Sequence, residues 1–279
     1  MPELRAADRC LDVAPASNLL DSLLAAGITV PYSCRAGSCH ACLVRCVGGE
    51  LLDGKPEALD DARREQGWRL ACQCRVVEDV SIEVFDPLRD AAPAVIHSCD
   101  WLSSDVLRLR LTPQRPLRYS AGQHLQLWTE DGIARPYSLA SLPGDDPWLE
   151  FHIDCRHGGA FATAARAFQP GGSLRLGELR GAALHYDPDW QARPLWLMAS
   201  GTGLAPLYGV LREAIRQEHQ GAIRVIHLAH DAAAHYLAEP LQALAASHPQ
   251  VQVELLVAAE LPAALAELRL VSRQTIALL

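Results

Sequence analysis

The sequence PYSCRAGSCHAC, at residues 31–42, places three cysteines within one short stretch. Their spacing is cysteine, four residues, cysteine, two residues, cysteine, and a fourth cysteine, Cys72, follows further along the chain. This C-x4-C-x2-C…C spacing is typical of sites that hold a [2Fe–2S] cluster through four thiolates. Such a cluster carries excess negative charge, so it needs backbone N–H groups that point at its sulfur atoms. Small residues such as Ala36 and Gly37 let the main chain come that close. The stretch therefore predicts a loop that wraps around an iron–sulfur cluster.

The loop resembles the cluster loop of plant-type ferredoxins, and Leu70–Cys74 resembles the segment of that family that supplies the fourth ligand. The resemblance implies a β-grasp fold of the α+β class for this part of the chain. The metal ligands that it implies are Cys34, Cys39, Cys42 and Cys72. Cys74 is a nearby competitor that the spacing alone does not exclude.

Zinc and disulfide bonds are the alternatives for so many cysteines. A zinc site usually takes two C-x2–4-C pairs, whereas this chain has a triplet with one distant partner. Disulfides require an oxidising compartment, and we find no charged-then-apolar leader with a cleavage site. Nine cysteines is also an odd number. We therefore favour the cluster. The remaining cysteines are interpreted as small buried hydrophobic residues: Cys10, Cys46, Cys99 and Cys155.

Length and composition predict a soluble protein of two or three domains. The chain has 279 residues, of which 49% are hydrophobic, enough for real cores. No apolar run approaches the eighteen or so residues that a membrane helix needs. The net charge of −8 disfavours binding to nucleic acid and suits a basic protein partner. Reduced thiols without a leader indicate the cytoplasm.

Three folding units are expected in order along the chain. The boundaries that we predict are 1–86 for the ferredoxin-like unit, 87–93 for a linker, 94–192 for an antiparallel β-barrel and 193–279 for an α/β unit with a parallel sheet. The barrel follows from short strands, such as 106–111, that are separated by Pro, Gly and Asp turns.

A short motif in the barrel resembles the flavin-binding signature of the ferredoxin–NADP reductase superfamily. It consists of Gly122-Gln123 and the segment RPYS at residues 135–138. Arg135 supplies a charged fork for a phosphate, Tyr137 a flat face against the flavin, and Ser138 a hydroxyl that reaches the ring edge. Tyr137 and Ser138 are therefore the expected catalytic residues, because they would lie beside the reacting ring.

A second flavin element is expected after Gly158-Gly159, where a helix over 160–168 begins. A helix that starts at glycine presents free N–H groups to a pyrophosphate. The residues that we expect to hold the dinucleotide FAD there are Gly159, Ala160, Phe161 and Ala162. The family commonly has Ser or Thr in this turn, whereas this chain has Ala162, so backbone amides or Thr163 must serve.

The third unit begins with an apolar strand over 195–199, which leads through SGTGLAP at residues 200–206 into a helix. Another strand follows over 223–229, so the pattern is a parallel β-α-β crossover with a glycine turn at the carboxyl end of its first strand. The turn resembles the nicotinamide-nucleotide turn of the same superfamily. This implies that Gly201, Thr202 and Gly203 hold the nucleotide.

The charges around this unit favour NADH over NADPH. A 2′-phosphate needs a cationic partner, yet there is no Lys or Arg between Arg224 and Arg269, and Asp231 would repel the extra phosphate. His230 and His235 are the only local donors that could replace a cation; otherwise we expect them, like most of the eleven histidines, on the surface.

The resemblance covers nearly the whole chain, in the domain order of the reductase components of bacterial oxygenases. It implies that NADH gives a hydride to FAD and that the cluster passes single electrons to an acceptor protein such as a terminal oxygenase. The family continues into a Cys-Gly-x-Pro loop, whereas this sequence ends on the apolar segment 274–279, so we expect an incomplete third unit. The alternative is a one-electron carrier or redox-responsive module with an inactive reductase part. Neither the identity of the acceptor nor the oligomeric state follows from the sequence.

Overall fold

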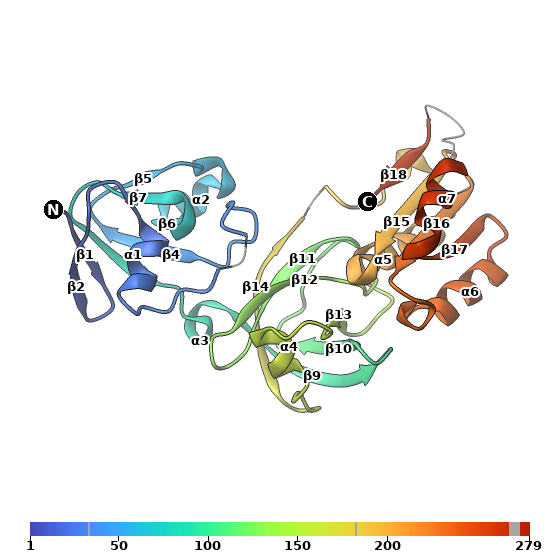
Figure 1. Cartoon of the computed structure of the whole chain (residues 1–279), viewed down its shortest axis with the longest axis horizontal. Coiled ribbons are helices and arrows are strands. Elements are labelled where there is room, and N and C mark those ends of the chain that lie inside the picture. The colour runs from blue at the N-terminus through green and yellow to red at the C-terminus, as the bar shows by residue number, and fades with distance from the viewer. Residues whose placement is uncertain (33, 182, 268–273) are drawn as a thin grey trace. The chain divides into compact units, whose positions relative to one another are not determined.

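The computed structural model describes residues 1–279 except 33, 182 and 268–273. Figure 1 shows the chain from its N-terminal strands to strand β18. Two compact units are present. The first contains Met1–Ala92, Gln126–Pro136 and Arg175–Gly177, and the second contains Pro93–Leu125, Tyr137–Leu174 and Glu178–Leu279. No helix in the described part of the chain is long and apolar enough to cross a membrane.

The N-terminal part of the chain is an α+β fold with two sheets. The five-stranded sheet has the order β2-β1-β8-β4-β6, with β1 Glu3–Ala6, β2 Arg9–Asp12, β4 Leu43–Gly48, β6 Trp68–Leu70 and β8 Val80–Val84. The three-stranded sheet has the order β3-β7-β5, with β3 Ser17–Asn18, β5 Leu51–Asp53 and β7 Cys74–Val76. The helices are α1 Leu19–Ala25, α2 Asp61–Glu65 and the single turns η1 Pro56–Ala58 and η2 Ala71–Gln73.

Helix α1 has a capped N-terminus. The side chain of Asn18 accepts a hydrogen bond from the backbone N–H of Asp21 at 3.2 Å, which satisfies a donor of the first turn. The leucine face of α1, with Leu20 and Leu23, is buried in the core of this part, together with the inward positions Val80 and Ile82 of β8. This core supports the loop between α1 and β4, which carries the three clustered cysteines.

The middle of the chain is antiparallel. Its sheet has the order β12-β11-β14-β9-β10-β13. The strands are β9 Ala92–Trp101, β10 Val106–Pro113, β11 His124–Trp128, β12 Ala134–Ser138, β13 Leu149–Asp154 and β14 Ser173–Arg180, with the helices α4 Ala160–Ala165 and η3 Pro188–Trp190. Along β10, Leu109 and Leu111 are buried and Arg108 and Arg110 alternate with them, so the predicted strand is confirmed.

The segment predicted as a linker, 87–93, has regular structure. It contains the one-turn helix α3 Pro87–Asp90 and the first residues of β9. Asp86 caps α3, because its side chain accepts a hydrogen bond from the N–H of Leu88 at 2.9 Å. Within the first unit, Phe85 stacks on the buried Trp128 with ring centroids 5.0 Å apart.

The C-terminal part has a parallel sheet with the order β17-β16-β15-β18. The strands are β15 Leu195–Ser200, β16 Ile223–Ala229, β17 Val251–Val257 and β18 Ile276–Leu278. The helices are α5 Leu204–Arg216, α6 Ala238–Ser247 and α7 Leu261–Glu267, with the turns η4 Gly201–Gly203, η5 Ala232–Ala234 and η6 Ala258–Glu260. The predicted strand–turn–helix–strand order is confirmed. The apolar pattern of the sequence also predicts a last helix near residues 262–268, of which Leu268 lies outside the described residues.

Helix α5 is amphipathic, and its buried face explains the sequence pattern. Leu207, Val210 and Leu211 are almost completely buried in a core that they share with Leu195 and Leu197 of β15. Arg212, on the neighbouring face, forms a two-point ion pair with Asp146, with N–O distances of 2.6 and 3.0 Å. Helix α5 is therefore held in place from two sides.

Candidate functional site

The cysteine-rich loop has an unusual backbone. Three residues of the loop have positive φ angles: Arg35 at +50°, Gly37 at +76° and His40 at +55°. Residues other than glycine rarely adopt this region. A Cβ atom at Gly37 would lie 3.2 Å from side-chain atoms of both Gln73 and Lys55. This conformation is costly for a free loop and is typical of functional sites, where it aims backbone groups at a ligand.

Backbone N–H groups of the loop point at thiol sulfur atoms. The N–H groups of Ala36 and Cys39 approach Cys34 Sγ, with N–S distances of 3.3 Å each, and the N–H of Cys34 approaches Cys39 Sγ at 3.5 Å. The thiol of Cys72 receives hydrogen bonds from the Gln73 amide at 3.2 Å and from the backbone of Gly37. These donors are the kind that a cluster with excess negative charge requires, so the loop fits the cluster.

The thiols are arranged in two pairs, Cys34 with Cys39 and Cys42 with Cys72. Within the described residues, no three His, Cys, Asp or Glu side chains converge on one metal-sized point. Burial acts to raise the pKa of Cys34, but hydrogen bonds from the Ser38 hydroxyl and the backbone lower it to about 6. The hydrogen bond from Cys42 is the main cause that lowers the pKa of Cys72 to about 6. One thiol of each pair is therefore prepared to act as a thiolate, the form that binds iron.

Cys74 is in a different environment from Cys72. Its side chain is fully buried in the core of the N-terminal part, and burial raises the pKa of its thiol to about 12. Of the other cysteines, Cys155 is buried as predicted, but Cys10 is exposed and Cys46 and Cys99 are only partly buried. The prediction that all four are buried is wrong, because strand residues near a sheet edge, such as Cys10 on β2, stay accessible to solvent.

The predicted flavin residues lie on β12 and α4. Arg135, Tyr137 and Ser138 are all partly exposed on β12, and the ring of Tyr137 packs against that of Phe161 with centroids 5.0 Å apart. This contact brings the RPYS strand and the start of α4 together. Gly122 has φ +94°, and a Cβ there would lie 2.1 Å from the carbonyl oxygen of Leu184, so only glycine fits in the Gly-Gln pair.

Helix α4 is shorter than predicted, because it ends at Ala165 and Arg166 is its C-cap. Gly159 is the N-cap and gives no side-chain hydrogen bond, and Ala160 is exposed while Phe161 and Ala162 are buried. The first N–H groups of the helix are therefore open to a ligand. Neither Gly158 nor Gly159 has any atom within 4 Å of where a Cβ would stand.

The predicted nucleotide turn lines a cavity of about 200 Å³ at the carboxyl end of β15. Ser200, Gly201 and Thr202 form one wall, and Gly203 follows them as the last residue of η4 before α5. Residues from other parts of the second unit complete the cavity, among them Asp105, Asp154, Arg156, His230 and Tyr236.

Arg156 is a candidate site residue that the sequence did not indicate. It lies beyond β13, far from the turn in sequence, yet its Nη1 is 3.0 Å from Nδ1 of His230 and its Nη2 is 2.7 Å from Asp154. The other ring nitrogen of His230 is 2.9 Å from Asp231. Arg156 is distant from the turn in sequence, and only folding brings it there.

The histidines of the second unit are not all surface residues. His230 is exposed as predicted, but His235 is buried, as are His152, His219 and His227. His152 is held by Glu150, whose Oε1 is 3.0 Å from its Nε2, and by the hydroxyl of Tyr236 at 3.2 Å from Nδ1. A histidine that has such partners is easily buried, which the sequence pattern did not indicate.

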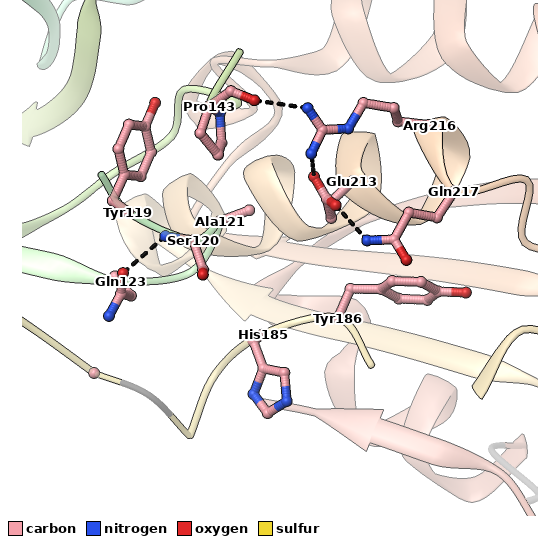
Figure 2. A pocket seen from close by; sticks show the side chains of 11 residues that line it. Tyr119, Ser120, Ala121, Gln123, Pro143, His185, Tyr186, Glu213, Arg216 and Gln217 are labelled. Carbon is pink, nitrogen blue, oxygen red and sulfur yellow. Dashed lines mark hydrogen bonds and ion pairs between the residues drawn. The ribbon is translucent and has the colours of Figure 1, made fainter. Parts of the chain in front are cut away.

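A second cavity of about 340 Å³ lies at the opposite end of α5, and Figure 2 shows its lining. The guanidinium of Arg216 bridges the carbonyl oxygen of Pro143, at 2.6 Å, and Glu213, which also accepts a hydrogen bond from Gln217. Glu213, Arg216 and Gln217 thus satisfy one another, whereas Nδ1 of His185 is buried and has no hydrogen-bond partner among the described residues. Gln123 of the Gly122-Gln123 pair lines this cavity, whereas none of the residues predicted to hold the cluster, the flavin pyrophosphate or the nucleotide does.

Comparison with known proteins gives three domain matches in the predicted order. They are a 2Fe-2S iron-sulfur cluster binding domain over residues 5–77, an oxidoreductase FAD-binding domain over 93–183 and an oxidoreductase NAD-binding domain over 197–265. The chain is 31% identical, over 87% of its length and 74% of the relative's, to the terephthalate 1,2-dioxygenase reductase component 1 of Comamonas sp. The chain belongs to this family of iron–sulfur flavoprotein reductases.

Further members of the reductase family agree with this result. A naphthalene 1,2-dioxygenase system ferredoxin–NAD(P)(+) reductase component of Pseudomonas putida is 30% identical, over 90% of this chain and 78% of that protein. The crystal structure of the Amycolatopsis cytochrome P450 reductase GcoB has a TM-score of 0.59 and 28% identity, and covers 92% of this chain and 81% of that one. The protein is thus an NAD(P)H-dependent oxidoreductase with [2Fe–2S], FAD and nicotinamide nucleotide as its redox groups.

Proposed function

We propose that this reductase takes electrons from NADH and delivers them, through FAD and the [2Fe–2S] cluster, to an acceptor protein, a terminal oxygenase. The observation that carries the proposal is the cavity at the end of β15, where the Ser200–Thr202 turn meets Arg156. The bound flavin accepts a hydride and releases single electrons, which is what joins a two-electron donor to a one-electron cluster. The basis for an oxygenase as acceptor is the names of the relatives.

In this proposal, Cys34, Cys39, Cys42 and Cys72 hold the cluster. Cys72 is preferred to Cys74 because its thiol lies at the loop and receives hydrogen bonds from Gly37 and Gln73, whereas that of Cys74 is enclosed in the apolar core. The backbone donors that already approach Cys34 and Cys39 would stabilise the negative charge of the cluster.

Residues of β12 and α4 hold the FAD. Tyr137 offers an aromatic face whose position is fixed by Phe161, Ser138 a hydroxyl at the ring edge, and Arg135 a guanidinium for a phosphate. The backbone of Gly159, Ala160, Phe161 and Ala162 would receive the pyrophosphate, since these residues form the open first turn of α4.

NADH is the preferred donor. Arg156 is the cation of the cavity, but Asp154 and the His230–Asp231 pair already engage it, and Asp105 adds another carboxylate to the lining. These three carboxylates outnumber the one guanidinium, so the dianionic 2′-phosphate of NADPH would meet net negative charge. Nicotinamide nucleotides are found in the cytoplasm, which supports a cytoplasmic location.

The test is the visible spectrum of the purified protein before and after anaerobic addition of NADH or NADPH. We expect flavin and cluster bands that bleach together with NADH, and at least a tenfold larger KM for NADPH. The double variant Asp154→Asn with Asp231→Asn should bring the KM for NADPH closer to the KM for NADH, because two of the three carboxylates lose their charge. Flavin and cluster bands that bleach with dithionite but not with NADH would contradict the proposal and favour a one-electron carrier.

A further inference from the structure

A chain of hydrogen bonds connects the nucleotide turn to two buried histidines. Nε2 of His227, on β16, lies 3.0 Å from the carbonyl oxygen of Gly201, and its Nδ1 lies 3.2 Å from Nδ1 of His235. His227 is fully buried and His235 is 8% exposed. The backbone N–H of Leu204 also points at the Gly201 carbonyl, so both lone pairs of this oxygen have a donor.

The direction of every hydrogen bond in this chain is fixed by chemistry. A carbonyl oxygen only accepts, so His227 must carry its proton on Nε2. Neutral His227 then has a lone pair on Nδ1, and His235 must donate to it from its own Nδ1. Nε2 of His235 is left as an acceptor; it is buried and finds no hydrogen-bond partner among the described residues. Neutral histidines in any other pair of tautomers would break a link of the chain.

The surroundings keep both histidines neutral near pH 7. Burial is the main cause that lowers the pKa of His227, to about 4, and it also lowers the pKa of His235. The carboxylates of Asp231 and Glu260 act in the opposite direction on His235 but do not outweigh its burial. The ring of Tyr236 packs edge-on against both histidine neighbours, His227 and His152, and its hydroxyl is turned to His152.

The hydrogen bond from His227 to the Gly201 carbonyl also fixes the direction of the next backbone donor, the N–H of Thr202. The C=O and N–H groups of a trans peptide point in opposite directions, so a Gly201 carbonyl that faces His227 makes the N–H of Thr202 face away from the histidines. Thr202 lines the nucleotide cavity, whereas His227 does not. Gly201 itself has φ +52°, and because glycine is free to adopt many backbone conformations, the residue alone does not fix the orientation of this peptide.

We propose that His227 and His235 are positioning residues for the nicotinamide nucleotide: through the Gly201 carbonyl they orient the peptide of the turn so that the Thr202 N–H is ready to bind a phosphate of NADH. This inference rests on the proposed function. The histidines do not touch the nucleotide and transfer no proton, so their effect is on binding of NADH and not on the chemical step.

The experiment compares His227→Leu with His227→Gln, whose amide nitrogen can replace Nε2 as the donor. The control is His219→Leu, since His219 is also buried in the second unit but pairs with the hydroxyl of Tyr186, at 2.9 Å, and not with the turn. The assay measures KM for NADH and kcat with ferricyanide, and NAD⁺ binding is measured by calorimetry. Loss of one neutral hydrogen bond predicts about a five- to tenfold rise of KM and Kd in His227→Leu.

We expect kcat, flavin content and the flavin spectrum of His227→Leu to stay near those of the wild type, with KM restored to within about twofold in His227→Gln. An unchanged KM in His227→Leu, or a KM in His219→Leu that rises as much, overturns the inference. A wild-type protein that neither binds nor oxidises NADH overturns the proposed function as well.

Nitrogen-15 NMR of the wild-type histidine side chains provides a second measurement that does not depend on how a variant folds. We expect His227 as the Nε2–H tautomer and His235 as the Nδ1–H tautomer at pH 7.5. Any other neutral pair, or a charged imidazolium at His227, overturns the proposed chain.

Discussion

Cys72 and Cys74 are separated by one residue and yet have opposite surroundings. Cys72 lies on η2, partly exposed, with the Gln73 amide 3.2 Å from its sulfur. Cys74 opens β7, pairs in register with Asp53 and points into the core. Residues two apart in an extended chain point to the same side, so strand alternation would place both thiols together; the turn of η2 separates them instead.

This difference predicts opposite results for two serine substitutions. Cys72→Ser should lose the [2Fe–2S] cluster completely while retaining the flavin, because a hydroxyl is a poor ligand for iron. Cys74→Ser should keep the cluster but lose about 1–2 kcal/mol of unfolding free energy, because it places a hydroxyl in an apolar core. Iron content, visible absorption and urea denaturation measure these effects. A cluster that survives in Cys72→Ser and is lost in Cys74→Ser would identify Cys74 as the ligand.

At the scale of single elements, β16 is unusual because a largely buried strand carries a histidine at a fully buried position. Its neighbours in the parallel sheet, β15 and β17, align His227 with Ala199 and Leu255. Leucine or valine would be expected at such a position. The histidine is tolerated because both of its ring nitrogens have partners, Gly201 and His235.

Burial of His227 predicts that the protein is less stable in acid. The unfolded chain takes up a proton near pH 6.5, whereas the folded protein does not protonate His227 until about pH 4. The unfolded state therefore binds more protons between these values, and stability falls as the pH falls through this window. The loss from this residue should reach about 2 kcal/mol at pH 5 and about 3 kcal/mol at pH 4.

The measurement is the unfolding free energy of the wild type and of His227→Gln at pH 7.5, 6.5 and 5. Other groups, such as His219 and His235, whose pKa values are also lowered by burial, act in the same direction in both proteins. The difference between the two proteins isolates His227. A wild type that loses no more stability than the variant would show that His227 is protonated in the folded protein.

At the scale of the whole molecule, the net charge of −8 affects how the protein associates with the partner that receives its electrons. A protein of this charge attracts basic partners and repels anions, and salt screens both effects. The net charge does not predict the fold, but it does predict how the rate of association with a charged partner depends on salt.

Two artificial electron acceptors of opposite charge test whether the net charge of the protein attracts or repels its partners. NADH-driven reduction of basic cytochrome c should slow several-fold when ionic strength rises from about 0.02 to 0.3 M, whereas reduction of ferricyanide, an anion, should become faster or stay constant. Measurement of both rates in the same buffers separates steering from inactivation by salt. Equal slowing of the two would mean that salt disturbs the enzyme itself.

The local motifs of this chain were readable from sequence because each depends on a short run of backbone. The thiol loop, the RPYS strand and the Gly-Thr-Gly turn each need particular residues at fixed spacing, and the strand–turn–helix order around Gly201 follows from the apolar pattern of β15 and α5. The family and the order of its three domains followed from these motifs.

The environment of single side chains required the tertiary structure. Arg156 reaches the cavity at the glycine turn from beyond the end of β13, and His235, which follows η5, meets His227 of β16. The physical reason is range: turn chemistry and periodicity act over a few residues, whereas burial, charge and hydrogen-bond partners depend on which distant segments pack together. Sequence alone therefore determined which cofactors the protein uses, and only the fold decided which charges and histidines surround the nucleotide turn.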